Sequence, residues 1–155
     1  QTFTMKFFLL LFCSIYLFSC KNDDEPEIDC ALYDPFISSL FIKLIDSEGK
    51  NLIENNTYIA DDITVLFNGN TYTNVVFNNV KGIENLISLN LIGVDGNNPL
   101  KIKLSEEVTD TLILNLTAES QVCGWTFFTL NSATYNGVLQ PLEDFNGNHL
   151  ITVVK

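Results

Sequence analysis

Asn-Gly dipeptides stand between short apolar segments of this chain, at 68–69, 136–137 and 146–147. Both residues of such a pair tolerate positive φ, so the dipeptide is the strongest short-range signal for a tight β-hairpin. The apolar segments have strand length and are rich in residues that pack well on a pleated sheet, namely Ile, Val, Leu, Phe and Thr. No segment has sustained helical spacing, although Asp34-Pro35 is a start signal for one turn of helix. The pattern predicts an all-β fold.

Alternation of apolar and polar residues locates the strands. Leu112, Leu114 and Leu116 share one face of segment 110–117, and the residues between them share the other. Further strands are predicted at 40–45, 51–53, 63–67, 70–77, 86–92, 101–104, 122–130 and 150–154, with a loop at 95–99. About eight strands at this spacing predict an antiparallel β-sandwich, with a small β-barrel as the alternative.

The segment from Phe41 to Leu52 has a strand-turn-strand pattern around Asp46-Ser47-Glu48-Gly49-Lys50. It resembles the opening of transthyretin-like and carboxypeptidase-regulatory-like sandwiches. The resemblance covers this segment alone, so it implies the topology of the first strands and no activity.

An export pattern precedes the predicted strands. Met5-Lys6 is followed by an apolar run over 7–18, which is shorter than the about 20 residues that a membrane-spanning helix needs. The run ends at Leu17-Phe18-Ser19-Cys20, which resembles the lipobox of bacterial lipoproteins. This resemblance implies a signal peptide at 1–19, with 1–4 upstream of the true start, and acylation of Cys20. The alternative is an ordinary signal peptide that happens to contain a cysteine.

The residues after Cys20 are a lysine and then acids. Lys21, Asp23, Asp24 and Glu25 resemble the export tag of Bacteroidota surface lipoproteins. The resemblance implies a lipid-anchored protein of the outer membrane, displayed at the cell surface. The alternative is a periplasm-facing anchor in which the acids form a solvated tether. We expect a lipidated acidic tether at 20–29 and a single β domain at 30–155.

Two cysteines remain for the domain once Cys13 leaves with the signal peptide and Cys20 carries lipid. These are Cys30 and Cys123, and in an oxidising compartment they predict a disulfide. By the chain-entropy model a loop of this length contributes about 4–5 kcal/mol of stability. The alternative is two unpaired thiols. Neither cysteine has another Cys or His at zinc-ligand spacing.

The charge excludes one class of partner. The chain has 19 Asp and Glu against 8 basic residues, all of them lysines, for a formal net charge of −11. Without arginine there is no forked donor for phosphate, and the overall field repels nucleic acid. Anionic headgroups are repelled for the same reason, so membrane attachment depends on the lipid at Cys20.

Catalytic motifs are missing from the sequence. His149 is the single histidine, and neither Gly-x-Ser-x-Gly nor His-Glu-x-x-His occurs. Adjacent acids such as Glu143 and Asp144 point to opposite faces of a strand, so they do not converge. The sequence predicts a protein that is not an enzyme and has no cofactor.

Asp144, Asn146 and Asn148 place oxygen atoms at alternate positions, as at the start of a calcium loop. His149 stands where such a loop has its glycine, and Lys155 where it closes with a carboxylate. A hairpin with Asn146-Gly147 at its tip accounts for the same residues. No metal site is therefore predicted, and calcium at this trio is the alternative.

Aromatic residues gather around the segment 122–130. Trp125, Phe128 and Tyr135 are candidate binding aromatics, and Tyr58 and Tyr72 belong to the same set. Such side chains are normally core residues, but exposed ones form a surface for a carbohydrate or a peptide. On a strand, Trp125 and Phe127 share one face and Phe128 lies on the other.

These observations predict a membrane-anchored envelope lipoprotein that is a non-catalytic binding module for a glycan or a protein. A second hypothesis is an accessory subunit that docks onto an outer-membrane or envelope complex, and a third is a small hydrolase. Exposed clustered aromatics favour the first, an exposed apolar edge the second, and a pocket that gathers carboxylates the third.

Overall fold

The structure is a computed structural model, and it describes residues 29–120 and 122–155. The chain divides into two units, Gln1–Tyr33 and Asp34–Lys155. In the described part of the first unit, the Asp29 carboxylate accepts a hydrogen bond from the N–H of Ala31, and its carbonyl accepts one from Leu32. These bonds close a turn at 29–32. The second unit contains both β-sheets.

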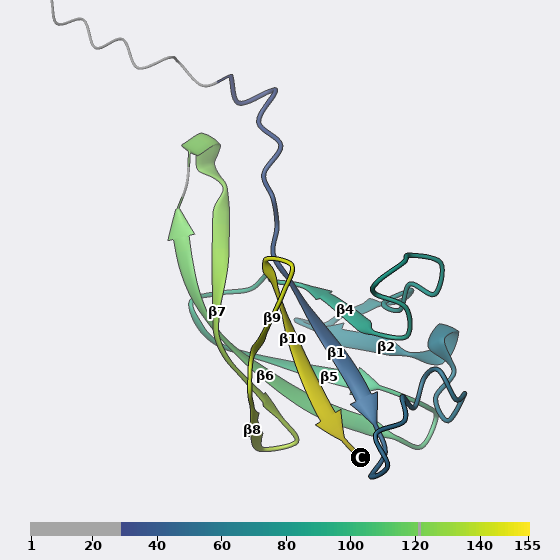
Figure 1. Cartoon of the computed structure of the whole chain (residues 1–155). Coiled ribbons are helices and arrows are strands. Elements are labelled where there is room, and N and C mark those ends of the chain that lie inside the picture. The colour runs from purple at the N-terminus through teal and green to yellow at the C-terminus, as the bar shows by residue number, and fades with distance from the viewer. Residues whose placement is uncertain (1–28, 121) are drawn as a thin grey trace, which may run out of the picture. The chain divides into compact units, whose positions relative to one another are not determined.

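Ten strands form two sheets in the described part of the chain, with the first and last strands, β1 and β10, side by side (Figure 1). The order of the four-stranded sheet is β4 (Ile87–Asn90), β1 (Ser39–Ile45), β10 (Asn148–Val154) and β9 (Glu143–Phe145). The order of the six-stranded sheet is β3 (Asn70–Tyr72), β2 (Thr64–Phe67), β5 (Gly96–Lys103), β6 (Thr109–Ser120), β7 (Thr126–Tyr135) and β8 (Val138–Gln140). Two short 3-10 turns complete the described elements, η2 (Ala60–Asp62) and η3 (Val122–Gly124).

The predicted sandwich is confirmed, and the barrel alternative is wrong because the two sheets do not close on each other. One strand pair departs from the antiparallel prediction. β1 and β10 run parallel, with Leu40 opposite His149 and Ile45 opposite Val154. The chain between these two strands builds the entire six-stranded sheet, and so long a connection lets the last strand return in the direction of the first.

The core lies between the sheets and follows the period-two pattern of the sequence. Leu112, Leu114 and Leu116 on β6 are buried, whereas Ile113 between them is 40% exposed. Burying one leucine of this kind stabilises the fold by about 1.5–3 kcal/mol. The predicted alternation on β6 is therefore confirmed.

The strand predicted at 51–53 is wrong. Asn51 makes a single isolated bridge to Ile45, and its side-chain oxygen accepts hydrogen bonds from the N–H groups of Ile53 (2.8 Å) and Glu54 (3.2 Å). An asparagine amide that competes for nearby backbone donors turns the chain instead of extending it. The helical turn predicted after Asp34 is also wrong, because the segment leads into β1 without helix.

Several strand limits differ from the sequence prediction, among them those of β5, β3 and β7. β5 begins at Gly96, where a loop was predicted, and contains Pro99. The pairing of β2 with β5 ends at Lys101, so this end of β5 is an edge, where a residue without an N–H is tolerated. β3 ends at Tyr72 because Asn74 has a positive φ of 54°. β7 begins at Thr126, four residues later than predicted.

Candidate functional site

The predicted lipidation site, Cys20, and the residues predicted as an export tag, Lys21, Asp23, Asp24 and Glu25, lie outside the described residues. Among the residues that the structure does describe, no helix is long and apolar enough to cross a membrane.

The predicted disulfide is present, and it joins Cys30 to Cys123. Cys123 occupies the turn between β6 and β7, with a left-handed φ of 64°, and Gly124 follows with a φ of 72°. Left-handed backbone at two successive residues reverses the chain tightly. The β6–β7 hairpin extends past the neighbouring strands of its sheet before this reversal (Figure 1).

Trp125 and Phe128, two of the candidate binding aromatics, line one hollow. The hollow has a volume of about 140 Å³. Its walls come from the start of β7, from the segment before β1 and from the segment after β4; they are Phe36, Ile37, Ser38, Leu91, Ile92, Trp125, Thr126, Phe127 and Phe128. We call it the Trp125 hollow.

Several side chains of the Trp125 hollow are open to solvent. Phe36 is 69% exposed and Trp125 is 45% exposed, and Ile37 and Ile92 are exposed as well. Phe128 is partly buried and packs against the core with one side. Large apolar side chains that gather at the surface mark a contact site more often than isolated ones do.

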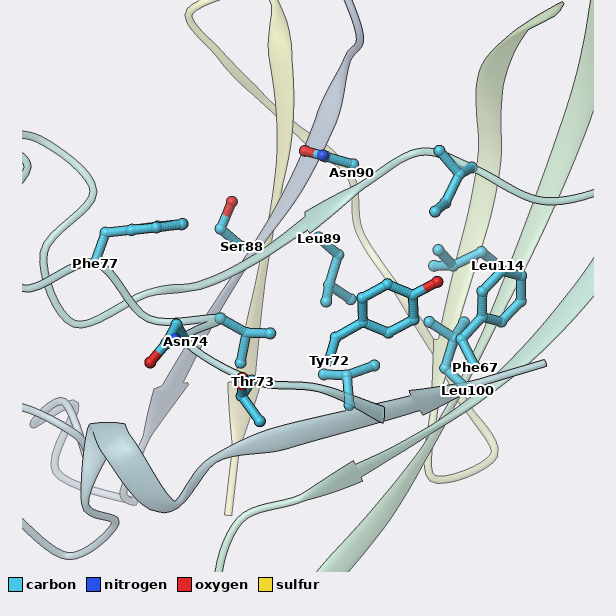
Figure 2. A pocket seen from close by; sticks show the side chains of 13 residues that line it. Phe67, Tyr72, Thr73, Asn74, Phe77, Ser88, Leu89, Asn90, Leu100 and Leu114 are labelled. Atoms are coloured by element: carbon cyan, nitrogen blue, oxygen red, sulfur yellow. The ribbon is translucent and has the colours of Figure 1, made fainter. Parts of the chain in front are cut away.

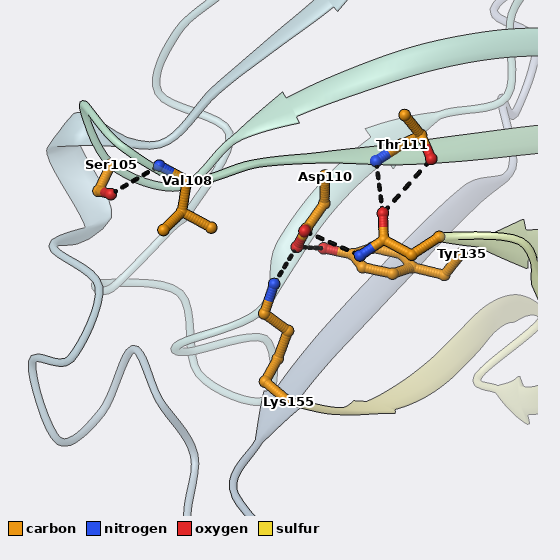
Figure 3. A network of polar contacts seen from close by, with 7 residues as sticks. Ser105, Val108, Asp110, Thr111, Tyr135 and Lys155 are labelled. Carbon is orange, nitrogen blue, oxygen red and sulfur yellow. Dashed lines mark hydrogen bonds and ion pairs between the residues drawn. The ribbon is translucent and has the colours of Figure 1, made fainter.

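Tyr135 is a core residue, and its assignment as a candidate binding aromatic is wrong. It is 2% exposed, and its hydroxyl donates to the Asp110 carboxylate at 2.8 Å. Asn136 donates to the same carboxylate at 2.8 Å, and Lys155 does so from the end of β10 (Figure 3). The Lys155 ammonium also lies 5.9 Å from the ring centroid of Tyr58. Because Asp110 is on β6, this network ties the two sheets together.

The pKa values of Asp110 and Tyr135 are shifted by burial and by the hydrogen bonds of this network. Burial tends to raise the pKa of Asp110, but hydrogen bonds from Lys155, Asn136 and Tyr135 outweigh it and lower the pKa below its ordinary value. Burial, followed by the hydrogen bond to Asp110, raises the pKa of Tyr135 far above its ordinary value. Each polar group of this network is hydrogen-bonded within the protein, as expected of a network that stabilises the fold.

A second cavity opens between the edges of the two sheets, with a volume of about 180 Å³. Figure 2 shows Tyr72 lying across it, between Leu89 of the four-stranded sheet and Phe67 and Leu114 of the six-stranded sheet. The floor consists of core side chains, and the rim carries Thr73, Asn74, Ser88 and Asn90; its other lining residues are Val65, Val75, Phe77, Ile92 and Leu100. We call it the Tyr72 cavity.

Ile92 lines both the Trp125 hollow and the Tyr72 cavity. Ile92 is therefore a wall shared by the two recesses. We call the segment 91–95, which crosses from β4 to β5 and exposes Ile92 and Val94, the ridge. The ridge is fixed from beneath by the buried Asn98. Its amide accepts from the N–H of Val94 (2.9 Å) and donates to the carbonyls of Val94 (2.8 Å) and Gly96 (3.0 Å).

The backbone of the ridge can pack closely against Asn98 because Gly93 has no side chain. A Cβ atom on Gly93 would lie 2.3 Å from the Asn98 side-chain oxygen, closer than atoms can pack. Sequence reasoning missed the ridge and its support, as well as Phe36. The available signal was Ile92-Gly93-Val94, in which two apolar residues flank a glycine between two strands.

The residues considered for calcium form a hairpin. Asn146 and Gly147 have φ values of 54° and 77° at its tip, and Asn148 pairs with Phe145. The Asn148 side-chain oxygen accepts a hydrogen bond from the N–H of Ser39 at 2.8 Å, so it holds β1. In the described residues no three His, Cys, Asp or Glu side chains gather as metal ligands.

No protein-family model, no curated protein and no solved structure matches this chain.

Proposed function

We propose that this protein is a lipid-anchored binding module of the bacterial cell envelope. Cys20 at the lipobox holds it in the outer membrane, and Lys21 with the acids that follow directs it to the cell surface. The domain binds a glycan or a protein and does not catalyse a reaction.

The Trp125 hollow is the observation that supports binding. Phe36, Ile92 and Trp125 expose apolar surface at one place. Exposure of such an apolar surface to water is unfavourable, so binding of a partner that covers it would lower the free energy. Among the described residues, neither the hollow nor the Tyr72 cavity is lined by a carboxylate, whereas hydrolysis of a glycoside needs a facing pair.

A second candidate function is docking onto an envelope complex through β8. This edge strand exposes Val138 (61%) and Leu139 (67%). An exposed apolar edge is a surface on which another chain can pair. A photo-crosslinking residue at position 139 tests it in intact cells, and the same residue at position 36 tests the Trp125 hollow. Adducts at 139 alone would favour docking over the proposed binding module.

Protease shaving of intact cells tests surface display, with a known periplasmic protein as the leakage control. We expect the domain to be cleaved while the control stays intact. Protection until the outer membrane is broken would show that the anchor faces the periplasm.

The chain has a single tryptophan, so its emission reports directly on the hollow. We expect the emission of the soluble domain to change with a ligand, and Phe36→Ala to weaken that ligand by roughly tenfold through lost apolar contact. Val138→Ala, which removes an exposed apolar side chain of β8, is the matched control and should have no effect. Equal affinity of both variants would contradict binding in the hollow.

A further inference from the structure

The Trp125 hollow and the Tyr72 cavity share Ile92 as a lining residue, so one ligand could contact both. A ligand that contacts Ile92 on one side of the ridge is already at the entrance to the space on the other side. Asn98 holds the ridge through three hydrogen bonds, so the spacing of the two recesses is set before a ligand arrives. Preorganisation of this kind favours one ligand that fills both over two independent ligands.

The lining decides between a sugar and a peptide side chain. Phe67, Leu100 and Leu114 form the floor of the Tyr72 cavity, and they offer no hydrogen-bond partner. A sugar ring placed there would find the Tyr72 hydroxyl as one partner and leave its other hydroxyl groups without any, which is costly, whereas an apolar side chain leaves none. The polar rim, with Asn74, Ser88 and Asn90, suits the amide groups of a peptide backbone.

The charges around the recesses indicate what flanks the apolar part of the ligand. No charged side chain of the described residues lines either recess, but three exposed acids stand beside residues of the Trp125 hollow. Asp34 precedes Phe36 by two residues, Asp95 is on the ridge and accepts from the N–H of Ala118, and Glu119 pairs opposite Phe127. Asp34–Lys155 contains 14 Asp and Glu against 6 Lys, a net charge of −8, so its surface attracts basic residues and repels acidic ones.

We propose that the Trp125 hollow and the Tyr72 cavity are two subsites for one extended segment of a partner protein, with an apolar side chain in each subsite and basic residues at the end that lies in the Trp125 hollow. This inference rests on the proposed binding function and names its partner class.

The probes are synthetic peptides in which two leucines are separated by one, two, three or four threonines, with lysines at both ends. Matched peptides carry one leucine, or glutamates in place of the lysines. We expect one spacing to change the Trp125 emission saturably and to bind at least about tenfold more tightly than its one-leucine counterpart, because a second apolar side chain is buried. The glutamate version should bind more weakly, and the difference should shrink as salt is added.

Thr73→Phe blocks the entrance of the Tyr72 cavity from its exposed rim, without touching the core. Thr71→Phe is the matched control, since Thr71 is an exposed β3 residue that lines neither subsite. We expect Thr73→Phe to remove the advantage of the second leucine and to leave one-leucine binding unchanged, whereas Thr71→Phe changes neither.

Three results would overturn the inference. If Thr73→Phe leaves the advantage of the second leucine intact, the Tyr72 cavity is not a subsite, although the Trp125 hollow can still be a binding site. If no peptide binds and a neutral oligosaccharide such as cellohexaose or maltohexaose does, the partner is a glycan and the proposed binding module stands. If neither peptides nor these oligosaccharides change the Trp125 emission, and a crosslinker at position 36 captures nothing in cells, the proposed function fails as well.

Discussion

At the scale of single residues, buried polar side chains have structural roles that apolar patterning does not reveal. Asp110, Asn51 and Asn98 are all buried, and each is hydrogen-bonded to groups that would otherwise lack partners. In the described residues no buried side-chain nitrogen or oxygen is left without a partner. Replacing any of these residues should therefore lower the free energy of unfolding, because their buried partners would be left without hydrogen bonds.

The Asp110 network predicts an acid-dependent loss of stability. Its carboxyl has a folded-state pKa below the 3.8 of the unfolded chain, so its contribution is full above about pH 5 and falls as the pH drops through 3.8 toward the folded-state pKa. Asp110→Asn leaves Lys155 without its counter-charge, and we expect a loss of about 3 kcal/mol in the free energy of unfolding at pH 7.

Urea denaturation at pH 7 and pH 3 measures this effect. The gap between the wild type and Asp110→Asn should be smaller at pH 3, because below pH 3.8 the unfolded wild-type chain takes up a proton at Asp110 more readily than the folded chain does, which favours unfolding. Asp62→Asn replaces an exposed acid of η2 and serves as the control. A gap of the same size at both pH values would show that the charge of Asp110 is not involved.

Substitutions at Gly93 and Asn98 should have non-additive effects on the free energy of unfolding, because the two residues are in contact. Gly93→Ala introduces a Cβ against the Asn98 side chain, and we expect it to destabilise the fold by about 1–3 kcal/mol. Asn98→Ala removes the hydrogen bonds of the ridge and should cost a similar amount. The double variant should be no less stable than Asn98→Ala alone, since the clashing side chain is gone. Thermal denaturation of the wild type, the two single variants and the double variant measures this double-mutant cycle. Additive losses of stability would show that the added Cβ does not clash with Asn98.

At the scale of elements, the disulfide fastens the β6–β7 turn to residue 30 and encloses most of the described chain in one covalent loop. A long enclosed loop restricts the unfolded chain strongly. The cross-strand asparagine contacts act on the same hairpin in a weaker way. Asn131 donates to Asn115, and Asn115 donates to Asn97, along the outer face of β5, β6 and β7.

Removal of the disulfide tests this element. We expect Cys30→Ser combined with Cys123→Ser to lower the free energy of unfolding by about 4 kcal/mol in the domain without its signal peptide. Denaturant unfolding of the wild type with and without reductant should show the same difference. A reduced wild type that is as stable as the oxidised form would refute the stabilising role.

At the scale of the whole molecule, the proposed attachment and the proposed recognition belong to different parts of the chain. The lipobox and the acidic residues after it supply the proposed address, whereas Asp34–Lys155 supplies the fold and both recesses. Membrane retention should therefore respond to the cysteine at position 20 and to nothing in the sandwich.

Cys20→Ala tests this separation. We expect the variant to lose label from a radioactive fatty acid and to leave the membrane fraction, because the acyl chains contribute about 0.8 kcal/mol for each buried methylene. Trp125→Ala should stay in the membrane fraction and keep its label. Unchanged membrane retention of Cys20→Ala would disprove the lipid anchor.

Local patterns in the sequence are enough to predict the all-β class, most strand positions, the hairpin turns at Asn68-Gly69, Asn136-Gly137 and Asn146-Gly147, and the disulfide partners. These features depend on period-two alternation, on residues that tolerate positive φ, and on a count of cysteines, all of which are local or compositional. Long-range contacts settle three further features: β1 and β10 run parallel, Tyr135 is buried while Trp125 is exposed, and Phe36, Ile92 and Trp125 meet. Alternation shows which residues share a face of a strand, but contacts between residues distant in the sequence decide which face is covered. The recesses are created by those contacts, so no local pattern could have located them.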